Sequence, residues 1–195
     1  MADKEFLADR RRSQEEEYIH RQEQQLIAKL RLRRQEDATR RGMAERTGIT
    51  DQETLGDLQA LGYTLETVML LNLVPLLEVA WAEGGISEHE RALIVEAARA
   101  HGANEGSAAD RQLATWLATQ PAADLFEHAR RTIGVMLEAA PPEEREARGR
   151  DLLAYCARIA SASGGILGFG KISPQEQEVI ARISKQLRHA PPPDA

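Results

Sequence analysis

Three glutamates lie close together in the stretch AWAEGGISEHE, which covers residues 80–90. Glu83, Glu88 and Glu90 carry carboxylates within eight positions of one another. A hard divalent cation binds several oxygen ligands, so these side chains and neighbouring carbonyl groups could hold one. The stretch is not an EF-hand, because the D-x-[DN]-x-[DN]-G pattern is absent. One interpretation of this loop is therefore a cation site that uses Glu83 and Glu90.

The same residues also fit the start of a helix. Ser87 followed three positions later by Glu90 has the spacing of a capping box, in which each side chain satisfies a backbone N–H at the helix N-terminus. Ser173 and Glu176 repeat this spacing. Under this second interpretation Glu83 is a solvated residue of the preceding turn. The sequence leaves both interpretations open.

The other reactive side chains are isolated from one another. The predicted positions of the five histidines are too scattered for zinc, which requires about four clustered ligands. Cys156 lies between Leu153 and Ile159 on an apolar helix face, so we expect a small core residue and not a nucleophile. No catalytic triad, phosphate-binding loop or dinucleotide fingerprint occurs. We therefore expect a non-enzymatic protein.

Charge divides the chain unevenly. Residues 1–48 hold 12 Lys/Arg and 10 Asp/Glu, a net charge of +2, and residues 49–195 hold 13 and 21, a net charge of −8. The acidic remainder argues against nucleic-acid binding. The basic clusters at 10–12 and 31–34 are interleaved with acids and have no aromatic platform, so we expect a solvated face there.

The composition indicates a soluble protein of the cytoplasm. A single cysteine rules out a disulfide within the chain. The N-terminal residues have no apolar segment of the kind that a signal peptide requires. The longest apolar run, 68–77, is about half a membrane span and contains Pro75.

The first 48 residues predict a long charged helix that forms an arm. The segment from 3 to 46 has no proline, and its alternating charges suit a solvated helix. Ile19, Leu26 and Leu30 fall on one narrow stripe, which suits a coiled coil or a partner's groove better than a core. We expect self-association or partner binding through this stripe. Deleting residues 1–46 is expected to leave the rest of the chain folded.

Residues 49–190 predict a bundle of seven or eight helices. The first of them is expected to begin with a capping box at 50–53. The run 65–82 is apolar on every side, which is typical of a central helix, and Pro75 predicts a kink or break near Asn72. Further helices are expected to begin after Ser87, Ser107, Pro121, Pro141 and Ser173. No segment alternates with the period of a strand, so the fold class is all-α, with residues 191–195 as a disordered Pro-rich tail.

Two parts of the bundle share one sequence motif. In each, an apolar helix ends at Gly-Gly, and Ile-Ser then precedes a helix that has Glu three residues after the Ser; the glycine pairs begin at Gly84 and Gly164. The second copy holds six additional residues, close to LGFGKI. Two helix–Gly-Gly–helix units predict a pseudo-symmetric bundle.

This motif resembles that of the TerB-like domain, whose pattern is roughly A-D-G-x-I-S-x-x-E. The chain has AEGGISEHE at 82–90, and the second copy is similar, over about 65–190 in total. The resemblance implies a compact helical domain, in some members with acidic metal-binding positions, often in stress-response, tellurite-resistance or membrane-linked systems. Glu83 and Ser163 stand where the family pattern has Asp, which weakens the case for a metal site that needs both carboxylates.

The arm is similar in style to the zeta-type subunits and inhibitor proteins that regulate ATP synthase. Phe6, Asp9 and Arg10 match the opening F-x-x-D-R of those helices. The resemblance covers residues 5–34 and implies an ATPase regulator as a further alternative.

The insertion ILGFGK, at 166–171, is apolar where loops are usually polar. Ile166, Leu167 and Phe169 either fold back to cover the bundle or form an exposed apolar loop for a protein partner or a membrane surface. The sequence therefore predicts an interaction module with three candidate sites: the arm stripe, this loop and the Glu83 loop.

Overall fold

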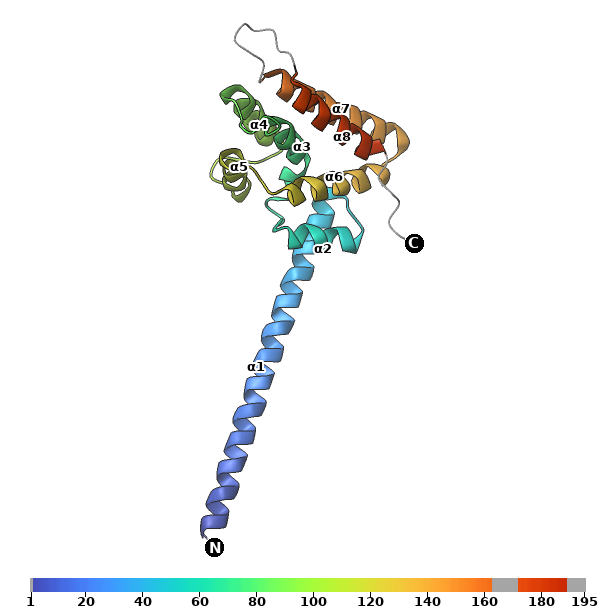
Figure 1. The fold of residues 1–195 in the computed structure, drawn as a ribbon. Helices are drawn as coiled ribbons and strands as arrows, with labels where there is room; N and C mark the ends of the chain where they lie inside the picture. Colours follow the sequence, from blue (N-terminus) through green and yellow to red (C-terminus); the bar gives the residue numbers. More distant parts are fainter. Residues whose placement is uncertain (1, 163–171, 189–195) are drawn as a thin grey trace. The chain divides into compact units, whose positions relative to one another are not determined.

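The computed structural model describes residues 2–162 and 172–188, with side chains from Tyr18 onward (Figure 1). The described residues form eight α-helices, one 3-10 helix and no strand, so the predicted all-α class is confirmed. The chain divides into two units, residues 1–41 and 42–195. Sequence patterning placed this division between 48 and 49.

Helix α1, Ala2–Thr47, supplies the described residues of the first unit and the start of the second. Two residues of α1 within the second unit, Gly42 and Met43, pack closely there. Met43 is fully buried, and a Cβ added at Gly42 would lie 3.2 Å from both Cδ atoms of Leu65. Glycine at this position therefore allows Leu65 to approach the helix backbone.

We call the second unit the body. N-cap residues mark where several of its helices begin. Its elements are α2 (Gln52–Ala60), η1 (Val68–Leu73), α3 (Val74–Ala80), α4 (Glu88–Ala100), α5 (Ala108–Ala118), α6 (Ala123–Glu138), α7 (Pro142–Ala162) and α8 (Pro174–Arg188). Ser107 caps α5 by accepting a hydrogen bond from the Asp110 N–H, at 3.1 Å. The N-cap of α2 is Asp51 and not Thr50, because the Asp51 carboxylate accepts the Thr54 N–H at 2.7 Å.

The apolar run 65–82 does not form one helix. A 3-10 helix over 68–73 precedes α3, and Pro75 occupies the first turn of α3, where its missing N–H leaves no helical hydrogen bond unmade. The predicted break near Asn72 is confirmed, whereas a helix that starts at Leu65 is wrong, because Leu65 lies outside η1 and is 42% exposed.

Helix α3 is the central element of the body. All seven of its residues are buried, including Glu78, and it packs against α6, α7 and α8 (Figure 1). Helices α7 and α8 also pack against each other and against α6. The body thus places one acidic side chain at its centre, which requires a partner of opposite charge.

A hydrogen bond between two tryptophans links the C-terminal end of α3 to α5. The Trp81 indole Nε1–H donates to the carbonyl oxygen of Trp116 at 3.0 Å. The ring of Trp116 also meets Tyr63 edge-on, with centroids 6.1 Å apart. Both tryptophans of the chain therefore belong to the body.

Candidate functional site

The Glu83 loop is a helix corner with both capping-box bonds in place. The Ser87 N–H donates to Glu90 Oε2 at 2.7 Å, and the Glu90 N–H donates to Ser87 Oγ at 3.2 Å. Gly84 has φ +82°, a conformation that favours glycine, so it turns the chain between α3 and α4. Glu83 and Glu88 are exposed, whereas Glu90 is 2% exposed. The capping interpretation is confirmed for Ser87 and Glu90.

The second copy has the same geometry at the start of α8. The Ser173 N–H donates to Glu176 Oε2 at 2.7 Å, and the Glu176 N–H donates to Ser173 Oγ at 3.2 Å. Glu176 is 1% exposed. The repeated Ser-x-x-Glu thus encodes the same helix start twice. Residues 163–171, which include the second Gly-Gly and the ILGFGK segment, lie outside the described part of the chain.

The two capping boxes interact electrostatically. Burial raises the pKa of the Glu90 carboxyl above its ordinary value, hydrogen bonds to Ser87 oppose this, and the negative charges of Glu176 and Glu83 raise the pKa further. Among residues 18–162 and 172–188, no group of three or more His, Cys, Asp or Glu side chains is arranged to hold a metal ion. The cation site at Glu83 and Glu90 stays a prediction.

The raised pKa of Glu90 predicts a pH dependence of stability. A carboxyl whose pKa is higher in the folded state stabilises the fold below its unfolded-state pKa, and this contribution is lost as pH rises through the folded-state pKa. Glu90→Gln removes this titration and keeps an oxygen that can accept the Ser87 N–H. We therefore expect the free energy of unfolding of Glu90→Gln to gain on that of wild type between about pH 4 and pH 7.

Chemical denaturation across this pH range measures the effect. Glu88→Gln is the matched control, because Glu88 is exposed in the same helical turn and should follow wild type at each pH. Parallel pH profiles for wild type and Glu90→Gln would contradict the prediction.

Cys156 lies in the core, as its apolar neighbours predict. It is 0% exposed, and burial, together with the negative charge of Glu78, raises its pKa to about 12. A thiol in that state is protonated at neutral pH and is a poor nucleophile. The prediction that Cys156 is a core residue is confirmed.

A buried ion cluster, which the sequence does not reveal, joins α3, α6 and α8. Glu78 Oε1 accepts hydrogen bonds from Arg130 Nη1 at 2.5 Å and from Arg182 Nη2 at 3.2 Å. Arg130 Nε donates to Gln186 Oε1 at 2.7 Å. The side chains of Arg130 and Glu78 are only 10% and 7% exposed. The three charged residues of the cluster line an open hollow of about 530 Å³ together with Trp81.

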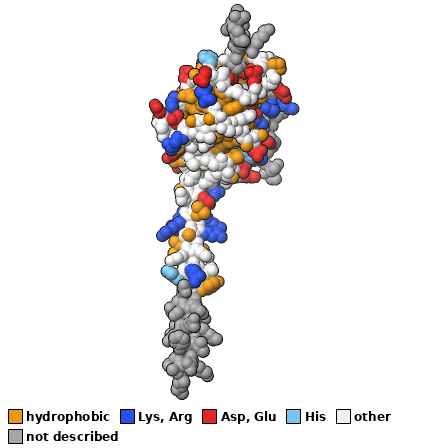
Figure 2. Space-filling model, turned by 60° about the vertical axis from the view of Figure 1, so that its left-hand side comes forward, with side chains coloured by type: hydrophobic (Ala, Val, Ile, Leu, Met, Phe, Trp, Pro, Cys, Tyr) orange, Lys and Arg blue, Asp and Glu red, His pale blue; other side chains and the backbone are white. Residues whose placement is uncertain are grey.

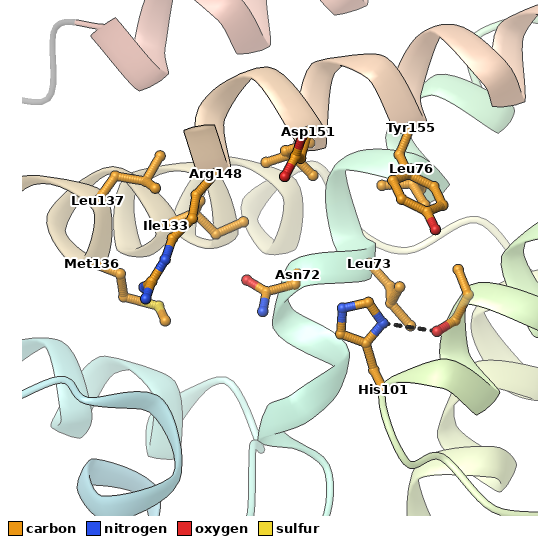
Figure 3. A pocket seen from close by; sticks show the side chains of 12 residues that line it. Asn72, Leu73, Leu76, His101, Ile133, Met136, Leu137, Arg148, Asp151 and Tyr155 are labelled. Carbon is orange, nitrogen blue, oxygen red and sulfur yellow. Dashed lines mark hydrogen bonds between the residues drawn. The ribbon is translucent and has the colours of Figure 1, made fainter. Parts of the chain in front are cut away.

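A second hollow is mostly apolar and lies among η1, α3, α4, α6 and α7 (Figure 3). Its volume is about 240 Å³, and its lining includes Leu73, Leu76, Ile133, Met136 and Leu137. Polar side chains surround these residues, namely Asn72, His101, Arg148, Asp151 and Tyr155 (Figure 3). Such a groove could accept a small apolar side chain of a partner.

Two polar residues at this groove already have partners. His101 Nδ1 is 2.8 Å from the Ala97 carbonyl oxygen, which can only accept a hydrogen bond, so the proton lies on Nδ1 (Figure 3). Arg148 donates to Glu144 at 2.8 Å. These contacts orient the side chains, and neither one pairs a base with a nucleophile.

The described part of the arm exposes large apolar side chains. Figure 2 shows hydrophobic side chains next to Lys and Arg side chains on this part of the helix. The stripe residues Ile19, Leu26 and Leu30 are 55%, 59% and 48% exposed. Three further apolar residues share this exposure, namely Tyr18, Ile27 and Leu32. The first unit thus offers more apolar surface than a solvated helix needs.

Comparison with protein-family models, with curated proteins and with solved structures finds no match to the chain. The TerB-like resemblance and the resemblance of the arm to ATP-synthase regulators therefore stay predictions. No described helix is both long and apolar enough to cross a membrane.

Proposed function

We propose that the protein is a non-enzymatic interaction module, TerB-like in its body, that binds protein through the apolar stripe of its arm. The observation that carries the proposal is the exposure of Ile19, Leu26 and Leu30, each about half accessible on one side of α1. Successive residues of a helix are about 100° apart, which places the three Cα atoms within roughly 40° around the axis. A stripe this narrow fits the seam of a coiled coil.

Pairing of the arm with another helix would bury apolar surface that the single helix exposes. Each large apolar side chain that is fully buried contributes about 1.5–3 kcal/mol, and half of that surface is available at each stripe position. Three positions on each of two helices can therefore support a weak to moderate association. The charged residues around the stripe keep the unpaired helix soluble and restrict the choice of partner.

The test replaces the whole stripe. The triple variant Ile19→Gln, Leu26→Gln, Leu30→Gln should weaken association at least about tenfold in sedimentation velocity over a concentration series. Glutamine keeps helix propensity high, so circular dichroism should show an unchanged helix content.

The matched control removes two exposed apolar side chains from another side of α1. Tyr18→Gln with Leu32→Gln changes two residues that are 64% and 57% exposed. They lie roughly 80° or more around the helix from the stripe. Association that is equally strong in wild type and the stripe variant would overturn the proposed function.

A further inference from the structure

The second hollow, among η1, α3, α4, α6 and α7, reaches the central run of the body from outside (Figure 3). Asn72 lines it and is exposed, whereas every other residue of 70–80 is buried. We propose that this hollow binds a small apolar amine, with the ammonium group at Asp151 and the hydrocarbon part on the apolar lining. The inference concerns the body and is independent of the stripe on the arm.

The volume of the hollow suits a ligand slightly larger than benzene. A protein cavity of about 150 Å³ holds one benzene molecule, and this hollow has about 240 Å³. A ring with a short chain therefore fits. Three buried side chains form what we call the floor of the hollow, namely Leu73, Leu76 and Ile133. Contact with the floor removes apolar ligand surface from water, which favours binding of a ring.

The charged side chains at the hollow leave one acid without a partner. Arg148 donates to Glu144 at 2.8 Å, so its charge is already matched. Within the described part of the chain, the Asp151 carboxylate forms no ion pair and no hydrogen bond. Arg158 lies 5.3 Å from the centre of the Tyr155 ring and lines a smaller neighbouring hollow instead. A positive group of a ligand would therefore provide the counter-charge for Asp151.

His101 supplies a second acceptor. Its Nδ1–H donates to the Ala97 carbonyl oxygen at 2.8 Å, so Nε2 of the neutral imidazole carries a lone pair. Figure 3 shows this second ring nitrogen on the side of the ring that faces Asn72. An ammonium group has three N–H donors, and Asp151, His101 and Asn72 can each accept one. A carboxylate ligand would instead meet the negative charge of Asp151 and the lone pair of His101.

NMR titrations of the full chain test the ligand class. The probes are phenethylamine, the neutral phenethyl alcohol, the anionic phenylpropionate, and butylamine, whose straight chain resembles that of lysine. At about pH 7.5 alkylammonium groups remain charged. Phenethylamine should then bind with a dissociation constant below about 1 mM, at least about tenfold more tightly than each of the other three. The side-chain amide signals of Asn72, assigned by their loss in Asn72→Ala, should shift during the titration.

Two variants locate the ammonium group. Asp151→Asn removes the charge of an exposed side chain and keeps its shape, so it should weaken phenethylamine binding at least about tenfold and leave phenethyl alcohol binding unchanged. Glu96→Gln is the matched control, because Glu96 is exposed and lines the neighbouring hollow but not this one. It removes the same charge and should bind phenethylamine as wild type does.

Four results would overturn the inference. Equal affinity for phenethylamine and phenethyl alcohol would mean that the hollow has no preference for charge. Tighter binding of phenylpropionate would make Arg148 the contact of the charged group. Equal affinity for butylamine would mean that a ring on the floor contributes nothing and that a lysine side chain fits as well. Absence of saturable phenethylamine binding up to about 10 mM would show that the hollow is not an amine site. All four leave the proposed function of the arm unaffected, because no probe contacts the stripe.

Discussion

Replacing Glu78 with alanine should lower the free energy of unfolding by about 3–5 kcal/mol. Glu78 accepts hydrogen bonds from two arginines, and one of them, Arg130, is 10% exposed on its side chain. Removing the carboxylate leaves the Arg130 guanidinium buried without a counter-charge. A half-exposed Arg182 can turn to solvent, so Arg130 accounts for most of the loss. Urea denaturation of the full chain measures the effect.

A double variant separates the loss of the charge pair from the loss of volume. Glu78→Leu with Arg130→Met replaces both buried charges by apolar groups, and it should cost less than Glu78→Ala alone. Glu127→Ala is the surface control, because Glu127 lines the same hollow but is exposed. A loss below about 1 kcal/mol for Glu78→Ala would show that the cluster is not a stabilising centre of the body.

Removing residues 1–46 should destabilise the body by about 2–5 kcal/mol, whereas removing residues 1–41 should leave its stability nearly unchanged. The reason is Met43, which is 0% exposed and belongs to the core of the second unit. The sequence predicts that the rest of the chain stays folded without residues 1–46, and the burial of Met43 adds that its free energy of unfolding falls. Gly42 and Leu65 lose their close packing in the same deletion.

Thermal melts of the two truncated chains give the comparison. Met43→Ala in the full chain is the matched variant, because it removes the same buried side chain and keeps the helix. It should account for most of the difference between the truncations. Equal melting temperatures for the two truncated chains would contradict the assignment of Met43 to the core.

Local signals made much of the fold predictable from sequence. Ser87 and Ser173 each precede a Glu by three positions, and both form the expected capping boxes. Pro75 predicted the break in the central run because its ring is incompatible with a helix interior. The exact start of α2 was not predictable, since Thr50 and Asp51 are adjacent residues that both favour the N-cap.

Contacts between distant residues could not be predicted in the same way. Arg130 and Arg182 are 52 and 104 positions from Glu78, and nothing in helical periodicity pairs one charged residue with another so far away. The only signal was a glutamate within an otherwise apolar run, which indicates a buried acid that needs a partner. The electrostatic coupling of Glu90 with Glu176 likewise depends on how α4 and α8 pack.

The position of the two tryptophans allows the unfolding of the body and of the arm to be measured separately. Trp81 and Trp116 are joined by a hydrogen bond within the body, and the arm contains no tryptophan. Selectively excited indole emission therefore follows the body alone, while far-ultraviolet circular dichroism follows all helices, including the long arm. The difference between the two signals during a melt isolates the unwinding of the arm without any added label.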